Sequence, residues 1–359
     1  MRFIHMADVH FDSPFTVLTD KRDFGTERRL EQREAFRKAI EYISKEEIPY
    51  LFIAGDLYDQ NYIKESTIEF INNLFKTIPN TKIFISPGNH DPFLKNSFYN
   101  TFNWNKNVTI FNNEIKRIEL EEADIYGYGF GDFYCSNSKV EEIEIKNKEK
   151  INILLVHGAL DSSKAIDVQY NPISTNKLKE IGFDYVALGH IHKKTEKNKF
   201  NFIYPGSMIS FGFDELDEHG MLEIKIEKNK NKFDIDFIKL DNRKFEEKNI
   251  DISEINSMEE LIEKIDSIEL NEDYFYKIIL NGTKNIEINT REICKLIKRK
   301  DIILKIKNCT ETKYDFDKLS EQNNLKGIFV KKMLDKLKDK NEGREEIEKA
   351  IEIGLKAFE

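Results

Sequence analysis

Short apolar runs alternate with amphipathic stretches over about the first 240 residues of the chain, and this alternation predicts an α/β layered domain. The runs that read as buried strands cover residues 3–6, 50–54, 82–85, 151–156 and 185–188. Two of the connections between them have the apolar spacing of amphipathic helices. Their apolar residues are Phe36, Ala39, Ile40 and Ile43 in the first connection and Ile68, Ile71, Leu74 and Phe75 in the second. More β-rich sequence follows in NFIYPGS, MLEIKI and FDIDFIKL.

The pattern of apolar and polar residues changes near residue 245, where a second and smaller α/β unit is predicted. The segment SMEE at residues 257–260 has the form of a capping box and opens a helix. A strand YKIILNG, a helix TREICKLIKR and a strand DIILKIKN come next. Two amphipathic helices then close the chain, and the second carries one apolar stripe made of Ile347, Ala350, Ile351, Leu355 and Phe358. We therefore expect three parts, residues 1–244, 245–325 and 326–359.

The composition of the 359 residues, with 40% hydrophobic and 34% charged side chains, is that of a globular protein. No apolar run approaches the roughly 20 residues of a membrane span, and the N-terminal MRFIHMADVH lacks the apolar stretch of an export signal. Cys135, Cys294 and Cys309 form neither a disulfide framework nor a CxxC site, so we expect a cytoplasmic protein without a membrane partner. The formal charge of -9 argues against a surface coated with nucleic acid, but it leaves room for a local positive site.

Residue types that bind metal follow each of the five predicted strands. The set is Asp8, His10, Asp56, Asn89, His157, His190 and His192. The carboxyl ends of the strands line the ligand crevice in open α/β sheets, so we expect these groups to gather at one edge. The spacings D-x-H and H-x-H also place both side chains of a pair on the same side of an extended segment.

Each of these residues has an ordinary explanation when it is taken alone. A histidine such as His157 is more often a hydrogen-bonded residue at a sheet edge than a ligand, and Asp56 after a glycine fits a turn or a helix N-cap equally well. Lys193 and Lys194 fit a solvated turn as well as a phosphate-attracting pair. The joint pattern favours a metal site, because unrelated loop residues have no reason to be metal-ligand types after five successive strands.

The ligand set further predicts two metal ions and a separate acid. Seven oxygen and nitrogen ligands are too many for one tetrahedral zinc, and they suit two divalent ions that share a carboxylate. Two ions roughly 3.5 to 4 Å apart can make water nucleophilic and polarise a phosphoryl oxygen. His90 lies beside the ligand Asn89 in SPGNHDPF and is the predicted proton donor, with Asp91 orienting its imidazole.

The blocks DxH, GDxxD, GNHD, VHG and GHIH, in this order, resemble those of the calcineurin-like metallophosphoesterases. Within that superfamily, FIHMADVHFDSPF, LFIAGDLYD, ISPGNHDPF and VALGHIHK are similar to the SbcD and YhaO-type DNA repair exonucleases. The resemblance covers residues 1–215. It implies an α/β (α+β) fold, namely a four-layer α/β/β/α sandwich followed by a small C-terminal α/β capping domain.

The same resemblance implies roles for individual residues. One metal ion would be held by Asp8, His10, Asp56 and His192, and a second by Asp56, Asn89, His157 and His190, both usually manganese. His90 would be the transition-state histidine, paired with Asp91. Residues 245–325 would form the capping domain that faces DNA, residues 326–359 would dock an SMC-like coiled-coil ATPase, and the resemblance also allows a homodimer.

The function that this resemblance implies is a metal-dependent DNA nuclease of the 3'-5' exonuclease or single-strand endonuclease type. Protein phosphatases of the superfamily carry an arginine in GDxxDRG that grips a phosphomonoester, whereas Asp59 is followed here by Gln60 and Asn61, which favours a diester. One alternative is a phosphodiesterase for cyclic nucleotides or other small diesters. Another is a non-catalytic assembly module that binds a partner through its last helices, although their stripe could equally pack on the protein's own body.

Overall fold

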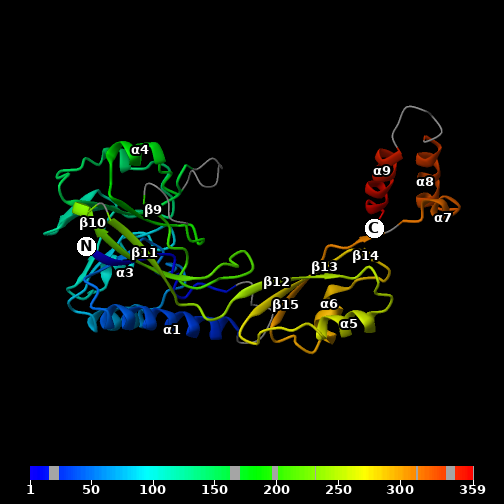
Figure 1. The fold of residues 1–359 in the computed structure, drawn as a ribbon, viewed down its shortest axis with the longest axis horizontal. Helices are drawn as coiled ribbons and strands as arrows, with labels where there is room; N and C mark the ends of the chain where they lie inside the picture. Colours follow the sequence, from blue (N-terminus) through cyan, green and yellow to red (C-terminus); the bar gives the residue numbers. More distant parts are fainter. Residues whose placement is uncertain are drawn as a thin grey trace. The chain divides into compact units, whose positions relative to one another are not determined.

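The computed structural model describes residues 1–15, 24–161, 170–195, 201–230, 232–312, 314–336 and 344–358 (Figure 1). The chain divides into two compact units. Unit 1 comprises Met1–Glu246 with Asn271–Phe275, and unit 2 comprises Glu247–Leu270 with Tyr276–Glu359. The functions expected for the three parts of the sequence stay predictions. No helix within the described ranges is long and apolar enough to cross a bilayer.

Unit 1 contains two sheets. The first has the order β11-β10-β1-β2-β3-β4, with the bounds β1 (Arg2–Met6), β2 (Tyr50–Ile53), β3 (Lys82–Ile85), β4 (Val108–Ile110), β10 (Gly220–Glu227) and β11 (Lys232–Lys239). Strands β1 to β4 run parallel, and β10 pairs antiparallel with both β1 and β11. The second sheet has the order β5-β6-β7-β8-β9, with the bounds β5 (Lys116–Glu119), β6 (Ala123–Gly127), β7 (Ile151–His157), β8 (Tyr185–Gly189) and β9 (Phe202–Ile203). Its strands β6 to β9 are parallel, and β5 is antiparallel.

The two sheets of unit 1 share one hydrophobic core. Phe3, Phe52 and Phe84 of the first sheet lie in the same buried cluster as Leu155 and Tyr185 of the second. Alternation explains this arrangement, since every second residue of a strand points to the same face. The polar His5 also lies between the sheets, where its Nδ1 is 2.8 Å from the hydroxyl of Tyr185.

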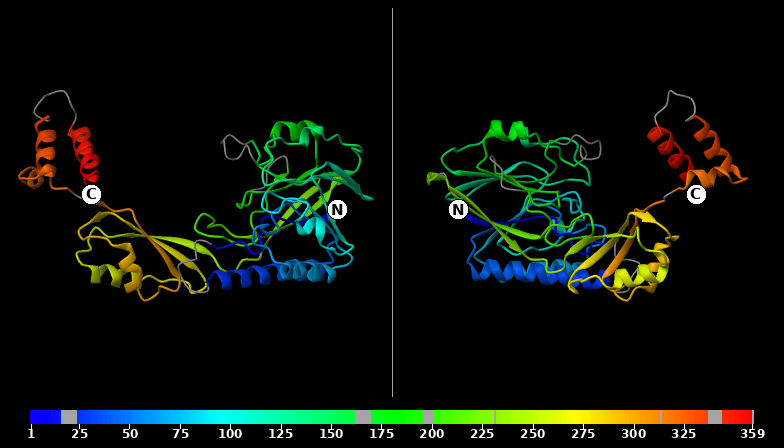
Figure 2. Two further views of the ribbon diagram at one scale, coloured as in Figure 1. Left: turned by 180° about the vertical axis from the view of Figure 1, so that it is seen from behind. Right: turned by 45° about the vertical axis from the view of Figure 1, so that its right-hand side comes forward.

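Helices flank the sheets of unit 1 on both sides. Helix α1 (Phe24–Lys45), in blue, and α4 (Thr175–Ile181), in green, lie on opposite sides of the strands in Figures 1 and 2. The predicted core residues of α1 are all buried, and in α2 (Glu65–Lys76) the predicted residues are buried except for the intermediate Leu74. The described connections also contain the short helix α3 (Phe98–Thr101) and 3₁₀ turns at Val140–Glu142 and Lys228–Lys230.

The five predicted strands are present, as β1, β2, β3, β7 and β8. The sequence suggested that all five strands end at one edge of a single sheet. They belong instead to two sheets, with β1 to β3 in the first and β7 and β8 in the second. The fold is therefore α/β with mixed sheets. Since the sheets pack face to face through the shared core, the ends of strands from both can still meet.

Unit 2 begins with a small sheet of order β12-β13-β15, with the bounds β12 (Phe245–Asp251), β13 (Phe275–Asn281) and β15 (Ile303–Asn308). Unit 2 also contains a two-stranded pair, β14 (Thr283–Lys284) and β16 (Glu311–Thr312), and the helices α5 (Met258–Asp266) and α6 (Thr290–Leu296). The predicted N-cap of α5 is present, since the side chain of Ser257 accepts a hydrogen bond from the backbone N–H of Glu260 at 3.2 Å.

The chain ends in α7 (Phe316–Ser320), α8 (Leu325–Lys336) and α9 (Arg344–Lys356). Ile347, Ile351 and Leu355 of the predicted stripe are buried in one cluster with Val330 of α8. Ala350 is exposed and Phe358 is 43% exposed, so the buried stripe is narrower than expected. The stripe of α9 thus packs on the protein's own helices.

Candidate metal centre

The residues that the sequence predicted as ligands lie where strands of both sheets end. Asp8 and His10 follow β1, Asp56 follows β2 and Asn89 follows β3, while His157 ends β7 and the two remaining histidines follow β8. Among the described residues, three groups have ligand atoms within 4.8 Å of one another. They are Asp8 with His10 and His192, His10 with Asp56 and His90, and Asp8 with Asp56 and His157.

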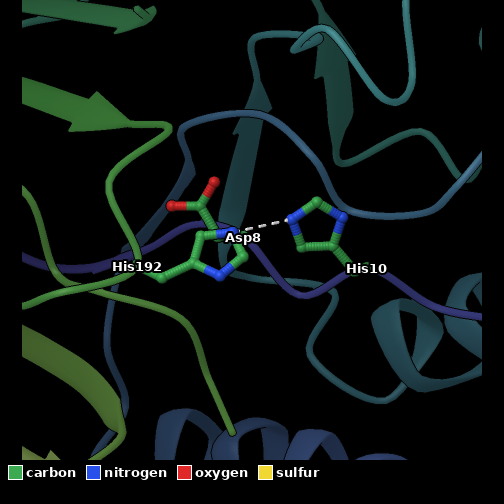
Figure 3. A group of neighbouring side chains, drawn as sticks. All are labelled: Asp8, His10 and His192. Carbon is green, nitrogen blue, oxygen red and sulfur yellow. Dashed lines mark hydrogen bonds between the residues drawn. The ribbon is translucent and has the colours of Figure 1, made fainter. Parts of the chain in front are cut away.

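The first group joins residues that lie more than 180 positions apart in the sequence. The Nε2 atoms of His10 and His192 are 3.1 Å apart, as the dashed line in Figure 3 marks, and the carboxylate of Asp8 lies beside both rings. His10 is only 4% exposed, whereas the side chain of His192 is 30% exposed. This group of two nitrogens and one carboxylate is therefore accessible to solvent on the side of His192.

Asp56 connects His10 of the first group to His157 of the third. Its Oδ2 lies 3.7 Å from Nε2 of His10 and 3.3 Å from Nε2 of His157. Oδ1 of Asn89 is also 3.0 Å from Nε2 of His157. Asp56 thus occupies the place between two sets of nitrogen and oxygen donors, which is what a carboxylate shared by two ions requires.

His190 is the one predicted ligand among the histidines and carboxylates that is in none of the three groups. Its ring packs beside that of His157, with the centroids 5.3 Å apart, and its backbone N–H donates to both carboxylate oxygens of Asp8, at 3.0 and 3.1 Å. His190 therefore borders the cluster without meeting the same distance limit.

The backbone around the centre adopts unusual conformations. Asp8, His10, Asp56 and His190 have positive φ values of 52, 53, 52 and 109°. Non-glycine residues adopt such values uncommonly, and they cluster at functional sites where the surrounding structure enforces them. A sharp left-handed turn directly after the strand is what aims each of these side chains back toward its neighbours.

Two glycines of the motifs are required because side chains of neighbouring loops approach them closely. Gly55 has a φ of 85°, and a Cβ atom there would overlap the ring of His157. A Cβ on Gly88 would overlap the carboxylate of Asp56. The glycines in GDLYD and SPGNHD thus leave space for the donor groups of the opposite loops.

His90 is held by a carboxylate that the sequence did not single out. Its Nδ1 lies 3.5 Å from Oδ2 of Asp59, the second aspartate of GDLYD, and its side chain is 46% exposed. The hydrogen bond to Asp59 is the largest influence on His90 and raises the pKa of its imidazole.

Asp91, which is expected to orient His90, makes its hydrogen bonds with other groups of the described residues. This carboxylate is fully buried and accepts backbone N–H groups of Gly88, Asp56 and Leu57 at 2.6, 3.0 and 2.6 Å. Its Oδ2 also accepts the hydroxyl of Tyr99 at 2.6 Å. Asp91 therefore ties the loop after β3 to the loop after β2, and Asp59 takes the position beside His90.

A second residue that sequence reasoning missed is Glu215. Its Oε1 is 2.6 Å from Nδ1 of His192, and its Oε2 accepts hydrogen bonds from the hydroxyl of Ser207 at 3.1 Å and the N–H of Phe211 at 3.0 Å. Such carboxylate partners fix the tautomer and orientation of metal-binding histidines. The GDxxD spacing could have indicated Asp59, whereas nothing in the local sequence distinguishes Glu215 from the nearby Asp214, Asp217 and Glu218.

Burial and mutual charge set the protonation of the cluster. Desolvation raises the pKa of Asp8 to about 6. Burial alone would raise the pKa of Asp56 as well, but the imidazoles of His157 and His10 outweigh it and hold this pKa below its ordinary value. Burial opposes the charge on His157, and Asp56 more than reverses this and raises the pKa of that imidazole to about 9. The carboxylate of Asp56 and the imidazole of His157 thus favour each other's charged forms.

The donor set fits divalent cations. Asp8 and Asp56 are 0% and 2% exposed, and in the part of the chain that the structure describes their ion pairs are with imidazoles and not with lysine or arginine. Buried carboxylates are costly unless they are paired or coordinate metal, and a divalent cation would supply the positive charge that the imidazoles supply here. Lys193 and Lys194 direct their ammonium groups to Asp217, at 3.4 Å, and to the ring of Phe237, at 3.7 Å. The oxygen and imidazole donors, without a thiolate, suit hard or intermediate divalent ions.

An α/β fold of mixed sheets that gathers buried aspartates and histidines at its strand ends defines a metal-dependent phosphoesterase. Comparison with protein families agrees, since residues 1–194 match the family Calcineurin-like phosphoesterase. The match covers more than half of the chain, and the chain belongs to this family.

Three relatives have low but extended sequence similarity. The chain is 25% identical over 294 residues to the "Uncharacterized metallophosphoesterase YhaO" of Bacillus subtilis, covering 79% of this chain and 69% of that protein. It is 26% identical over 263 residues to a protein of Staphylococcus epidermidis that is named as the SbcD component of the nuclease SbcCD, covering 64% and 67% of the two chains. The protein of the same name from Staphylococcus saprophyticus is 26% identical over 270 residues, covering 65% of this chain and 68% of that protein.

Proposed function

We propose that this phosphoesterase is a DNA nuclease of the 3'-5' exonuclease or single-strand endonuclease type. The observation that carries the proposal is the convergence of aspartates and histidines from two sheets in a chain distantly related to components of a nuclease. The absence of an arginine after Asp59, where Gln60 and Asn61 follow, supports a diester substrate.

Two divalent ions, of which Mn²⁺ is the proposed one, would be held by the predicted ligand residues. One would be bound by Asp8, His10, Asp56 and His192, and the other by Asp56, Asn89, His157 and His190. Such ions supply charge to a phosphoryl oxygen and lower the pKa of water. The His10 and His192 nitrogens and the carboxylate of Asp8 already face one another, so binding needs little rearrangement on that side.

The acid in this proposal is His90. Its Nδ1 faces Asp59, so the tautomer with a proton on Nδ1, and after protonation the imidazolium, is favoured. Nε2 would then give its proton to the leaving oxygen of the cleaved strand. The half-exposed position of the ring leaves it accessible to a polymer.

The remaining expectations belong to the same proposal. Unit 1 would be the four-layer α/β/β/α sandwich of the family, supported by the shared core of the two sheets and by helices on both sides. Residues 245–325 would cap the DNA, residues 326–359 would dock an SMC-like coiled-coil ATPase, and two copies of the chain would form a homodimer. The relationship to components of a nuclease named SbcCD supports a partner chain.

The proposal is tested by comparing two substrates in Mn²⁺. Purified protein should degrade a 3'-tailed DNA duplex and turn over a cyclic nucleotide slowly or not at all. Brisk hydrolysis of the cyclic nucleotide with intact DNA would instead favour a small-molecule phosphodiesterase. If the protein binds less than one equivalent of Mn²⁺ after loading and dialysis, the assembly module becomes the better assignment.

A further inference from the structure

A small aromatic pocket opens beside His90. It has a volume of about 170 Å³, and its lining includes Phe133, Tyr134 and Tyr170 as well as Asn61 and His90. A larger groove of unit 1, of about 970 Å³, is lined in part by residues of α1 and contains none of the predicted site residues. We propose that the small pocket binds the nucleobase next to the scissile phosphate, an inference that rests on the proposed nuclease function.

The aromatic rings form one continuous surface that leads to the metal centre. The rings of Tyr134 and Tyr170 have centroids 6.1 Å apart with an angle of 33° between their planes. The ring of Tyr170 in turn lies 5.1 Å from that of His190 at 38°. The side chain of Tyr134 is 61% exposed. Its open face is available to a planar ligand.

This surface is held rigidly against the centre. Cys135 forms a parallel bridge with Tyr170, and the N–H of Asn171 donates to the carbonyl of Cys135 at 2.6 Å. The side-chain amide of the fully buried Asn171 donates to the carbonyl of His157 at 2.6 Å. Both tyrosines are thus anchored to β7 at the residue that faces Asp56. A rigid platform loses little conformational entropy when it binds a ligand.

The pocket also has a polar edge suited to a base. Asn61 is exposed, and it follows Gln60, whose N–H donates to the carbonyl of His90 at 2.8 Å. This contact sets Asn61 beside the proposed acid. An amide carries both a donor and acceptors, so it can pair with the edge of any base.

A nucleobase suits this combination better than a peptide or a sugar. The volume accommodates a single planar ring system and is below the several hundred Å³ of ordinary ligand pockets. Every base offers a π face, and stacking on aromatic side chains is the usual way in which single-stranded DNA is held without sequence preference. The presence of His90 and Asn89 in the lining places such a base within one nucleotide of the reacting phosphate.

The test measures binding of two labelled oligomers by fluorescence anisotropy, in buffer with Ca²⁺ and no Mn²⁺. One is oligothymidylate, and the other is an abasic oligomer of equal length. Wild-type protein should bind oligothymidylate more tightly, and Tyr134→Ala should weaken that binding about tenfold or more without affecting the abasic oligomer. Tyr134→Phe should bind as the wild type does. Tyr62→Ala is the matched control, because Tyr62 is 53% exposed and lies outside the pocket lining.

Equal binding of the two oligomers by wild-type protein would overturn the base site. The same conclusion would follow if Tyr134→Ala bound both oligomers as tightly as the wild type does, or if it weakened the binding of both oligomers by the same factor. The outcomes also separate this inference from the nuclease proposal. If binding depends on Tyr134 and DNA stays intact in Mn²⁺, the nuclease proposal fails and the base site stands. If DNA is cleaved and Tyr134→Ala changes neither binding nor KM, only the base site fails.

Discussion

Nδ1 of His192 lies 2.6 Å from Oε1 of Glu215, and this contact leaves Nε2 of His192 directed at His10. The other carboxylate oxygen of Glu215 is held by Ser207 and by the backbone of Phe211. The hydrogen bond to Glu215 outweighs the effect of burial and raises the pKa of His192 to about 9. Glu215 thus controls both the orientation and the charge of a predicted ligand.

Replacing Glu215 should weaken metal binding without removing a ligand. We expect Glu215→Ala to lower the affinity for Mn²⁺ by about 10 to 100-fold, because His192 loses the partner that fixes its tautomer. Glu215→Gln should have a smaller effect, since its amide oxygen can still accept from Nδ1. Isothermal titration calorimetry measures both. Asp217→Ala is the control, because Asp217 is 59% exposed and pairs with Lys193; wild-type affinity in Glu215→Ala would contradict this role.

Substitutions of His90 and His157 should have different effects on metal binding and on cleavage. We expect His90→Ala to retain both ions and to slow single-turnover cleavage by about 10² to 10⁴, the usual effect of removing a positioned proton donor. His157→Ala should lose an equivalent of bound metal, because Nε2 of His157 faces Asp56 and Asn89. Metal content and cleavage rate are measured on the same preparations. Identical behaviour of the two variants would show that the roles are wrongly assigned.

The hydroxyl of Tyr99 should matter for stability. It donates to the buried carboxylate of Asp91 at 2.6 Å, and Tyr99 itself is 5% exposed. Tyr99→Phe removes one hydrogen bond to a charged group and should lower the free energy of unfolding by about 1.5 to 3 kcal/mol. Urea denaturation measures the change, with the exposed Tyr62→Phe as a control expected to be neutral. A neutral Tyr99→Phe would mean that Asp91 is satisfied by its backbone donors.

His5 should make the protein sensitive to acid. Burial lowers the pKa of its imidazole from 6.5 to about 3, and its Nε2 has no hydrogen-bond partner within the described residues. Between those two pH values the unfolded state binds a proton that the folded state does not. The contribution of neutral His5 to the free energy of unfolding is therefore complete above pH 6.5 and is lost as the pH falls toward 3.

The variant His5→Leu cannot take up this proton and isolates the effect. The difference in unfolding free energy between wild type and His5→Leu should shift by about 2 kcal/mol against the wild type between pH 7.5 and pH 5. Urea titrations at the two pH values measure it. A difference that does not change with pH would show that His5 is protonated equally in the folded and unfolded states.

The strands can be predicted from the sequence because buried parallel strands are short apolar runs with little ambiguity. The predicted strand at residues 82–85 coincides with β3 (Lys82–Ile85), and the other four predicted strands differ from the observed ones by one residue at an end. The partition of these strands between two sheets is not predictable, since local periodicity carries no information about which strands pair. The ligand types after the strands are visible because they form compact motifs.

The contacts that support the site are harder to predict than its ligands. The sequence suggested Asp91 as the partner of His90, because the two residues are adjacent, whereas in the structure the carboxylate of Asp59 lies beside Nδ1 of His90. Glu215 contacts His192 although the two residues lie 23 positions apart in the sequence. Side chains that act across irregular segments depend on tertiary packing, which no local pattern encodes.

The left-handed backbone at Asp8, His10 and Asp56 has a consequence for protein engineering. Glycine adopts these angles without the steric penalty that other residues meet there, but at Asp8 and Asp56 it would remove the carboxylates that accept the backbone N–H groups of His190 and His90. Glycine substitutions that relieve strain at other left-handed turns should therefore destabilise these two. Efforts to raise the heat resistance of this scaffold are better aimed at positions away from these turns.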